Sequence, residues 1–247
     1  KLAWLICIVV FLISAGLLAK DLYQAKKDQN TYEQLALQVQ RRDKTSQTLS
    51  ETGLLNKYDF LWQQNHHLGG WLLINDTPVN YPVMYTPDDP DYYLRRAFDG
   101  GYSASGSLFI AEGCSPDTDH VIIYGHHMKN HTMFGSLPLY ESTDYAQKHA
   151  VIHFDTLTEE REYQVLAAFY SRVYRQDEEN VFRYYQYTNL SDPNIFAEYI
   201  EQVRLSALYD TGVEAVYGDR LLTLSTCSYH TDNGRFVVIA VCKKPTE

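Results

Sequence analysis

Hydrophobic and polar residues are distributed in three different ways along the 247-residue chain. Residues 2–19 are apolar, with only Ser14 and Gly16 as mild interruptions, and they just reach the length of a transmembrane helix. We therefore expect residues 1–20 to be a membrane anchor. A cleaved signal peptide is the alternative, because residues 15–19 include small side chains. The anchor is favoured because a helical segment follows, rather than an immediate domain start.

The next part of the chain is polar and then becomes amphipathic. Residues 21–50 are charged and contain few apolar side chains, which predicts a helical stalk or linker. Residues 51–68 carry apolar side chains at helical spacing, which predicts an amphipathic helix packed on the body. We expect Gly69 and Gly70 to end this helix.

From Trp71 onward, short apolar runs rich in β-branched residues alternate with polar turns. The 21 tyrosines, against 10 phenylalanines and 3 tryptophans, also favour a β-rich body. The fold class is therefore mainly β, in one domain over residues 51–247. The expected strands are 71–74, 79–84, 107–110, 120–125, 150–154, 161–174, 220–226 and 235–242.

A further helix is predicted between the last strands. Asp192 stands in a good N-cap position and Pro193 in the first helical position. Apolar residues then recur at helical spacing to about Leu208. Residues 140–148 predict only one or two helical turns.

Composition excludes some classes of function. The net charge of −10 and the lack of a basic stripe argue against nucleic-acid binding. The sequence has no zinc-spaced Cys/His set and no phosphate-cradling glycine loop. We therefore expect neither a metal nor a nucleotide cofactor.

The four cysteines do not form a disulfide framework. If residues 227 and 235 meet across a hairpin, antiparallel pairing puts Cys242 opposite roughly residue 220. That separation from Cys227 is too long for a disulfide. We expect Cys114 and Cys242 to be packed apolar side chains and Cys227 to be a free thiol.

Cys227 ends the apolar run 220–226, and a polar loop separates it from Arg235, which opens the next run. This pattern predicts two strands joined by a loop, with a thiol and a cation facing each other at its base. A permanent cation favours the thiolate, which is the nucleophilic form of cysteine.

A proton partner for the thiol lies at the end of the expected strand 120–125, where Gly125 is followed by His126 and His127. Histidine suits acid–base chemistry because its ordinary pKa lies near neutrality. Successive side chains of an extended segment point to opposite faces, so only one of this pair can face the cleft. His120 and His131 are further alternatives.

Two of these segments resemble a known family. Residues 223–227, Thr-Leu-Ser-Thr-Cys, followed by Arg235, resemble the T-L-x-T-C…R signature of the sortases. Residues 124–130, Tyr-Gly-His-His-Met-Lys-Asn, are similar to the histidine segment of that family, and of class B in particular. The resemblance also includes segments beginning at Gly70, Tyr81, Asp91, Gly106 and Leu208. It spans roughly residue 55 to the C-terminus.

The resemblance implies a closed β-barrel of about eight strands with an N-terminal helix and a helical insertion between strands 6 and 7. It selects His126, directly after the glycine, as the catalytic proton shuttle. Cys227 is then the nucleophile, and Arg235 hydrogen-bonds the substrate carbonyl and the oxyanion. Ser225 and Tyr229 are expected to contact the substrate, although Ser225 is as well explained as a strand serine satisfied by backbone.

The implied activity is that of a membrane-anchored cysteine transpeptidase without a cofactor. It would cleave the C-terminal sorting signal of a secreted protein after a threonine. The acyl group would then pass to an amine of a cell-wall precursor, on the extracytoplasmic side of the membrane. Three alternatives stay open: a pilin-polymerising sortase, a hydrolytic cysteine peptidase with the same dyad, and a non-enzymatic wall protein.

Overall fold

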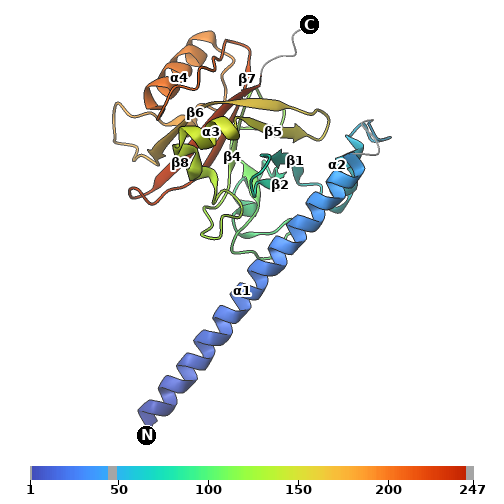
Figure 1. Ribbon diagram of the computed structural model, residues 1–247, viewed down its shortest axis with the longest axis vertical. Coiled ribbons are helices and arrows are strands. Elements are labelled where there is room, and N and C mark those ends of the chain that lie inside the picture. Colours follow the sequence, from blue (N-terminus) through green and yellow to red (C-terminus); the bar gives the residue numbers. More distant parts are fainter. Residues whose placement is uncertain (1, 44–48, 243–247) are drawn as a thin grey trace.

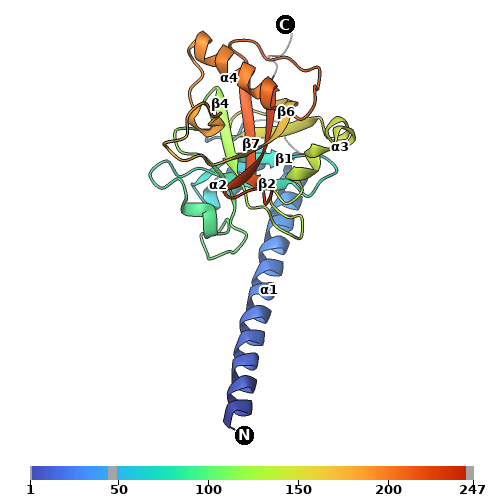
Figure 2. The ribbon, with the colours of Figure 1, turned by 90° about the vertical axis from the view of Figure 1, so that its left-hand side faces the viewer.

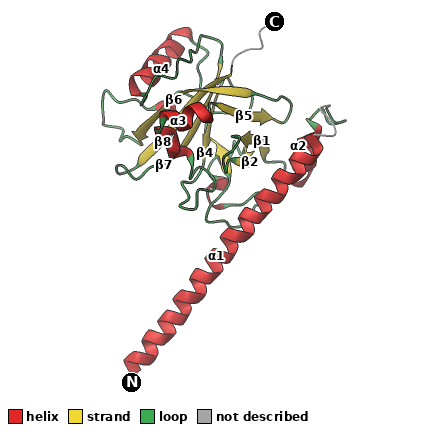
Figure 3. Ribbon diagram, in the orientation of Figure 1, coloured by secondary structure: helices red, strands yellow, loops and turns green. Residues whose placement is uncertain are grey.

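Eight strands close into a barrel in the computed structural model, which describes residues 2–43 and 49–242 (Figures 1 and 3). Their order around the barrel is β1-β2-β3-β4-β7-β8-β6-β5. The strands are β1 (Leu68–Leu73), β2 (Asn80–Met84), β3 (Leu108–Ile110), β4 (His120–Tyr124), β5 (Val151–Thr156), β6 (Glu162–Arg172), β7 (Arg220–Cys227) and β8 (Gly234–Cys242). Residues 44–48 of the expected linker and 243–247 of the expected catalytic domain lie outside the described residues.

Strand alternation gives the barrel wall two apolar faces. On β7, Leu222 and Leu224 belong to the core that fills the barrel. Leu221, on the same strand, instead joins an outer cluster that includes Val237 and Ile239 of β8. The wall is therefore buried on both sides in this region, which explains why β7 and β8 are nearly continuous apolar runs.

The outer cluster is covered by the insertion between β6 and β7. Its helix α4 (Pro193–Ser206) begins at Asp192, whose side chain accepts hydrogen bonds from the backbone N–H groups of residues 194 and 195. Its buried face is formed by Phe196, Tyr199, Ile200 and Val203. A short 3₁₀ helix, η3 (Tyr184–Gln186), precedes it in the same insertion.

The N-terminal helix α1 (Leu2–Asp43) has an exposed apolar half and a docked polar half (Figures 1 and 2). Tyr32, Leu35 and Val39 are buried against the barrel, and the Tyr32 ring meets Tyr81 of β2 edge-on at 5.4 Å between centroids. Within the described residues, α1 is the one helix long and apolar enough to cross a membrane, with a mean hydropathy of 2.0 in its most apolar window. A signal sequence near the N-terminus has the same properties.

The remaining helices are short. They are α2 (Asn56–Gln64), α3 (Thr143–Lys148), and the 3₁₀ helices η1 (Tyr92–Arg95) and η2 (Leu137–Glu141). Buried Lys57 of α2 forms ion pairs with Asp43, Asp155 and Glu160, and so ties the end of α1 to the barrel.

Most of the predicted elements are confirmed, and one helix is shorter than predicted. All eight strands and the helix after Asp192 occur within two or three residues of their predicted bounds. The helix expected over 51–68 is limited to α2. Gly69 and Gly70 do not end it; they belong to β1. A side chain at Gly70 would approach the backbone oxygen of Asp155 to 2.4 Å, so this glycine allows β1 and β5 to pack closely.

The prediction about the cysteines is also confirmed. Cys242 pairs with Arg220 across β7 and β8, and none of the four cysteines, all of which lie within the described residues, forms a disulfide. Cys114 is buried, as expected of a packed side chain.

Candidate active site

The ends of three neighbouring strands bring together Cys227, Arg235 and the paired histidines. β4 runs parallel to β7 with Tyr124 beside Ser225, so residues 125–127 follow next to Thr226 and Cys227. β7 runs antiparallel to β8 with Cys227 directly opposite Arg235. The pairing expected from the sequence, a thiol and a cation at the base of a hairpin, is therefore present in the structure.

Cys227 is exposed while its neighbours are fixed. The hydroxyl of buried Thr226 donates to the backbone oxygen of Gly125 at 2.8 Å, which joins the end of β7 to the segment after β4. The backbone N–H of Ser228 donates to the oxygen of Gly234 at 2.9 Å and closes the β7–β8 loop. The thiol is thus open to solvent on a rigid support.

His126 is held by a backbone carbonyl. Its Nε2 lies 2.8 Å from the oxygen of Leu94, at the end of η1. Since a carbonyl can only accept, Nε2 carries a proton, and Nδ1 is the nitrogen that gains and loses one. Burial lowers the pKa of His126; the hydrogen bond to Leu94 opposes this shift, and the charge of Arg95 adds to it.

His127 faces a different partner. Its Nδ1 donates to the backbone oxygen of Cys227 at 2.9 Å, and its ring stacks on Tyr229 with 5.5 Å between centroids. The two histidines therefore bind different partners, as expected for successive side chains that point to opposite faces of an extended segment. The bond between His127 and the Cys227 backbone has no signal in the sequence, because it joins segments 100 residues apart.

Arg235 is the second residue of β8, beside the loop that joins this strand to β7. Its Nη1 donates to the backbone oxygens of Asn233 at 3.3 Å and Gly234 at 3.0 Å. Its charge also acts on Tyr124: burial raises the pKa of that phenol to about 12, and Arg235 opposes the shift. The guanidinium is thus fixed beside the strand end that carries the thiol.

The two predicted substrate contacts differ in exposure. Tyr229 is 75 % exposed at the rim of the site. Ser225 is completely buried, and its hydroxyl lies 2.7 Å from that of Tyr184 in η3. The hydroxyl of Ser225 is therefore satisfied within the protein, by a side chain of the insertion rather than by backbone.

The other histidines considered from the sequence lie elsewhere. His120, at the start of β4, is fully buried under α4, where its ring nitrogens meet the oxygen of Tyr187 and the hydroxyl of Thr223. His131 is exposed in the loop after β4. Neither occupies the strand end next to Cys227.

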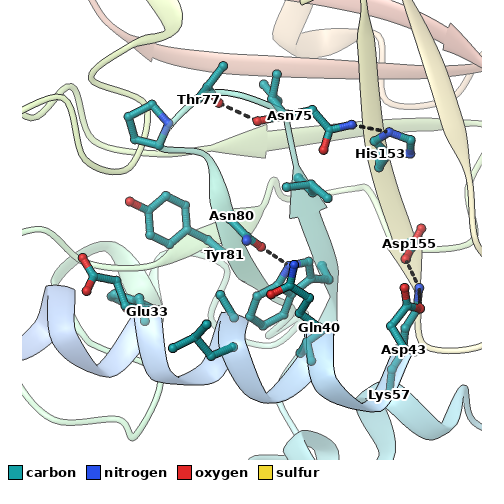
Figure 4. Close-up of a pocket in the computed structure, with 18 of the residues that line it drawn as sticks. Glu33, Gln40, Asp43, Lys57, Asn75, Thr77, Asn80, Tyr81, His153 and Asp155 are labelled. Atoms are coloured by element: carbon teal, nitrogen blue, oxygen red, sulfur yellow. Dashed lines mark hydrogen bonds and ion pairs between the residues drawn. The ribbon is translucent and has the colours of Figure 1, made fainter. Parts of the chain in front are cut away.

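A large cavity lies away from this site. It has a volume of 1140 Å³ and opens between α1 and the strands β1 and β2 (Figure 4). Glu33 and Gln40 of α1 line one side, and Asn80, Tyr81 and His153 line the other. Cys227, His126 and Arg235 do not line it.

Comparison with known proteins supports one family. A family model described as "Sortase domain" matches residues 72–243. Among curated proteins, the chain is 27 % identical over 238 residues to Sortase B of Listeria monocytogenes, covering 95 % of this chain and 92 % of that protein.

Solved structures agree in fold. The Staphylococcus aureus sortase B–substrate complex matches with a TM-score of 0.77 at 23 % identity, over 91 % of this chain and all of that one. A crystal structure of sortase B complexed with triglycine matches with a TM-score of 0.74 at 24 % identity, over 90 % of this chain and 99 % of that one. At these identities the likeness concerns the fold alone.

Proposed function

Because the chain belongs to the sortase family, within class B, and is thus a cysteine transpeptidase, we propose that Cys227, His126 and Arg235 form its catalytic site. The observation that carries the proposal is the register of β4, β7 and β8, which sets these residues at three adjacent strand ends. Its substrate is a C-terminal sorting signal, cleaved after a threonine, and its acceptor is an amine of a cell-wall precursor.

The first half of the reaction forms a thioester. The thiolate of Cys227 attacks the threonine carbonyl, and the guanidinium of Arg235 stabilises the developing oxyanion by hydrogen bonding. The carbon–nitrogen bond then breaks, and the leaving amine takes the proton from Nδ1 of the His126 imidazolium. The products are a thioacyl enzyme and a free amine.

The second half reverses these roles. The acceptor amine attacks the thioester carbonyl and gives a proton to Nδ1 of His126. The carbon–sulfur bond breaks, so the thiolate returns and a new amide is formed. Protons balance over the cycle, and this chemistry needs neither a metal nor an organic cofactor.

For the rest of the chain, we propose the division into anchor, linker and catalytic domain that the sequence predicts. Residues 1–20 anchor the protein in the membrane, residues 21–50 link the anchor to the body, and residues 51–247 form the catalytic domain on the extracytoplasmic side. The exposed apolar half of α1 supports the anchor. There the enzyme meets secreted proteins and the amine-bearing precursor.

The test uses the chain without residues 1–20 and a library of sorting-signal peptides, with and without short peptide amines such as triglycine. We expect a thioacyl adduct on Cys227 by mass spectrometry and a ligated product that increases with the amine. Cys227→Ala abolishes both, whereas Cys114→Ala and Cys242→Ala retain them. Turnover by Cys227→Ala would exclude the mechanism.

The same assay separates the alternatives. Cleavage that no amine diverts from water would indicate a hydrolytic peptidase. Ligation only to a lysine-bearing protein acceptor would indicate a polymerising sortase. No adduct with any peptide would indicate a binding protein.

A further inference from the structure

The docked half of α1 contacts the loop that leads into β3. Tyr32 is 2 % exposed, and its hydroxyl donates to the backbone oxygen of Gly106 at 3.1 Å. The same hydroxyl lies 2.8 Å from that of Ser107, which in turn donates to the backbone oxygen of Arg96 at 2.9 Å. Tyr32 of the helix therefore binds the end of the loop 96–107, and Ser107 links that end to the start of the loop at Arg96.

Gly106 presses this loop against the end of η1. Its φ is +59°, and a Cβ at this position would lie 2.5 Å from the backbone oxygen of Leu94 and 2.8 Å from that of Tyr93. Such distances leave no room for a side chain, so position 106 must be a glycine to lie this close to the Leu94 carbonyl oxygen.

The Leu94 carbonyl is the acceptor for Nε2 of His126 at 2.8 Å. Two hydrogen bonds, of Tyr32 with Gly106 and of Leu94 with His126, are thus linked by the close approach of Gly106 to Leu94, where an added Cβ would not fit.

We propose that Tyr32 and Gly106 are positioning residues for His126, which act by holding the Leu94 carbonyl in place. The docked part of α1 then contributes to catalysis as well as to attachment. This inference rests on the proposed function, in which His126 shuttles the proton. It adds a residue from outside the barrel to the machinery of that site.

The charged and titratable groups around His126 come from several elements. Arg95 of η1 is the cation that acts on it, and Cys227 and Arg235 end the neighbouring strands. His127 is adjacent in sequence. None of these is altered by the substitutions below, so a change at His126 reports on the Leu94 carbonyl.

The first variant is Tyr32→Phe, which keeps the ring against Tyr81 and removes the hydroxyl. We expect kcat to fall about tenfold with little change in KM, because a misplaced proton shuttle slows the chemical step. NMR titration of the His126 imidazole should show a lower pKa than in the parent, since the bond to Leu94 favours the protonated ring.

The second variant is Gly106→Ala, for which we expect a larger fall in kcat, of about a hundredfold. Gly212→Ala is its matched control, because Gly212 also has a positive φ of +70° but nothing within 4 Å of an added Cβ. Val39→Ala is the control for Tyr32→Phe. It removes apolar contact from the same face of α1 and should lower stability without moving the His126 titration.

Four outcomes decide between the proposals. A His126 titration and kcat in Tyr32→Phe equal to those of the parent would overturn it, as would a Gly212→Ala defect equal to that of Gly106→Ala. If His126→Ala stays active, the proposed function fails, while the NMR titration still tests the positioning. A shifted His126 titration together with a lowered kcat in Tyr32→Phe supports both the positioning role and the proposed function.

Discussion

His126 and His127 are adjacent in sequence but have different hydrogen-bond partners. His126 donates to Leu94, and its Nδ1 is the nitrogen left for proton exchange. His127 uses its Nδ1 to hold the carbonyl of Cys227. A mutation of each therefore removes a different property of the site.

His126→Ala should lower kcat/KM by about 10² to 10⁴, the usual contribution of a general acid–base group. His127→Ala should cost about tenfold or less, since the Cys227 backbone is also fixed by the pairing of β7 with β8. Steady-state kinetics on one peptide substrate compare the two. If His127→Ala proves the more damaging, the assignment of the shuttle is wrong.

Arg235 provides a second test at this scale. Arg235→Lys keeps the charge but loses the planar guanidinium, whose Nη1 donates to the backbone oxygens of Asn233 and Gly234. We expect kcat/KM to fall by about a hundredfold, as for the loss of an oxyanion donor. Kinetics near those of the parent would show that Arg235 acts only as a neighbouring charge.

At the residue scale, the sequence predicts what local spacing determines. Cys227 and Arg235 flank one short loop, so their encounter follows from hairpin pairing alone. The contacts of Ser225 with Tyr184, and of His126 with Leu94, join distant segments. Only the packing of the insertion and of η1 determines them, which is why the sequence predicted neither.

At the scale of elements, a buried histidine joins β4, β7 and α4. The ring of His120 lies between Thr223 of β7, the oxygen of Tyr187 and the hydroxyl of Tyr199 in α4. Burial lowers the pKa of His120 to about 4, although the bond to Tyr187 opposes the shift. The ring is therefore neutral in the folded protein across the ordinary range of pH.

This burial predicts a pH dependence of stability. In the unfolded chain, His120 gains a proton below about pH 6.5, whereas in the folded protein it stays neutral to about pH 4. The free energy of unfolding should therefore decrease as the pH falls through this window, by up to roughly 3 kcal/mol from His120. Urea unfolding of the parent and of His120→Gln at several pH values measures it. Identical pH dependence in both would contradict the assignment.

The elements themselves were predictable where the pattern was strong. Eight apolar runs bounded by turns became eight strands, because burial on one or both faces leaves few alternatives for such runs. The helix before β1 was predicted too long, since the Gly69–Gly70 pair has the appearance of a helix end. Gly70 is needed because β5 packs closely against β1 at this position, and that is a tertiary contact.

At the scale of the whole molecule, α1 is both a proposed anchor and part of the folded body. Removing residues 1–20 should convert a membrane-bound protein into a soluble, active enzyme of unchanged stability. Removing residues 1–43 also deletes Tyr32, Leu35 and Val39 from the core. At about 1.5–3 kcal/mol for each buried apolar side chain, we expect a loss of roughly 5 kcal/mol.

Membrane fractionation and urea unfolding of the two truncated proteins measure these effects. Equal unfolding midpoints of the two truncated proteins would show that the docked half of α1 does not stabilise the barrel. The sequence did not predict this docking, because the apolar positions of residues 21–50 are too few to indicate a buried face. Tyr32, Leu35 and Val39 are buried because apolar side chains of the barrel pack against them.

The docked helix has a consequence for the choice of substrates. Tyr32 lies at the same end of the barrel as Gly106 and His126, and α1 continues from there as one helix to its apolar half. With that half in a bilayer and the helix perpendicular to it, a rise of about 1.5 Å per residue sets Tyr32, and with it this end of the barrel, roughly 18 Å above the lipid. An exported chain or an amine-bearing precursor must bring its reacting atom to that height. The reach of its linker, as well as the sequence it presents, then decides whether it can react.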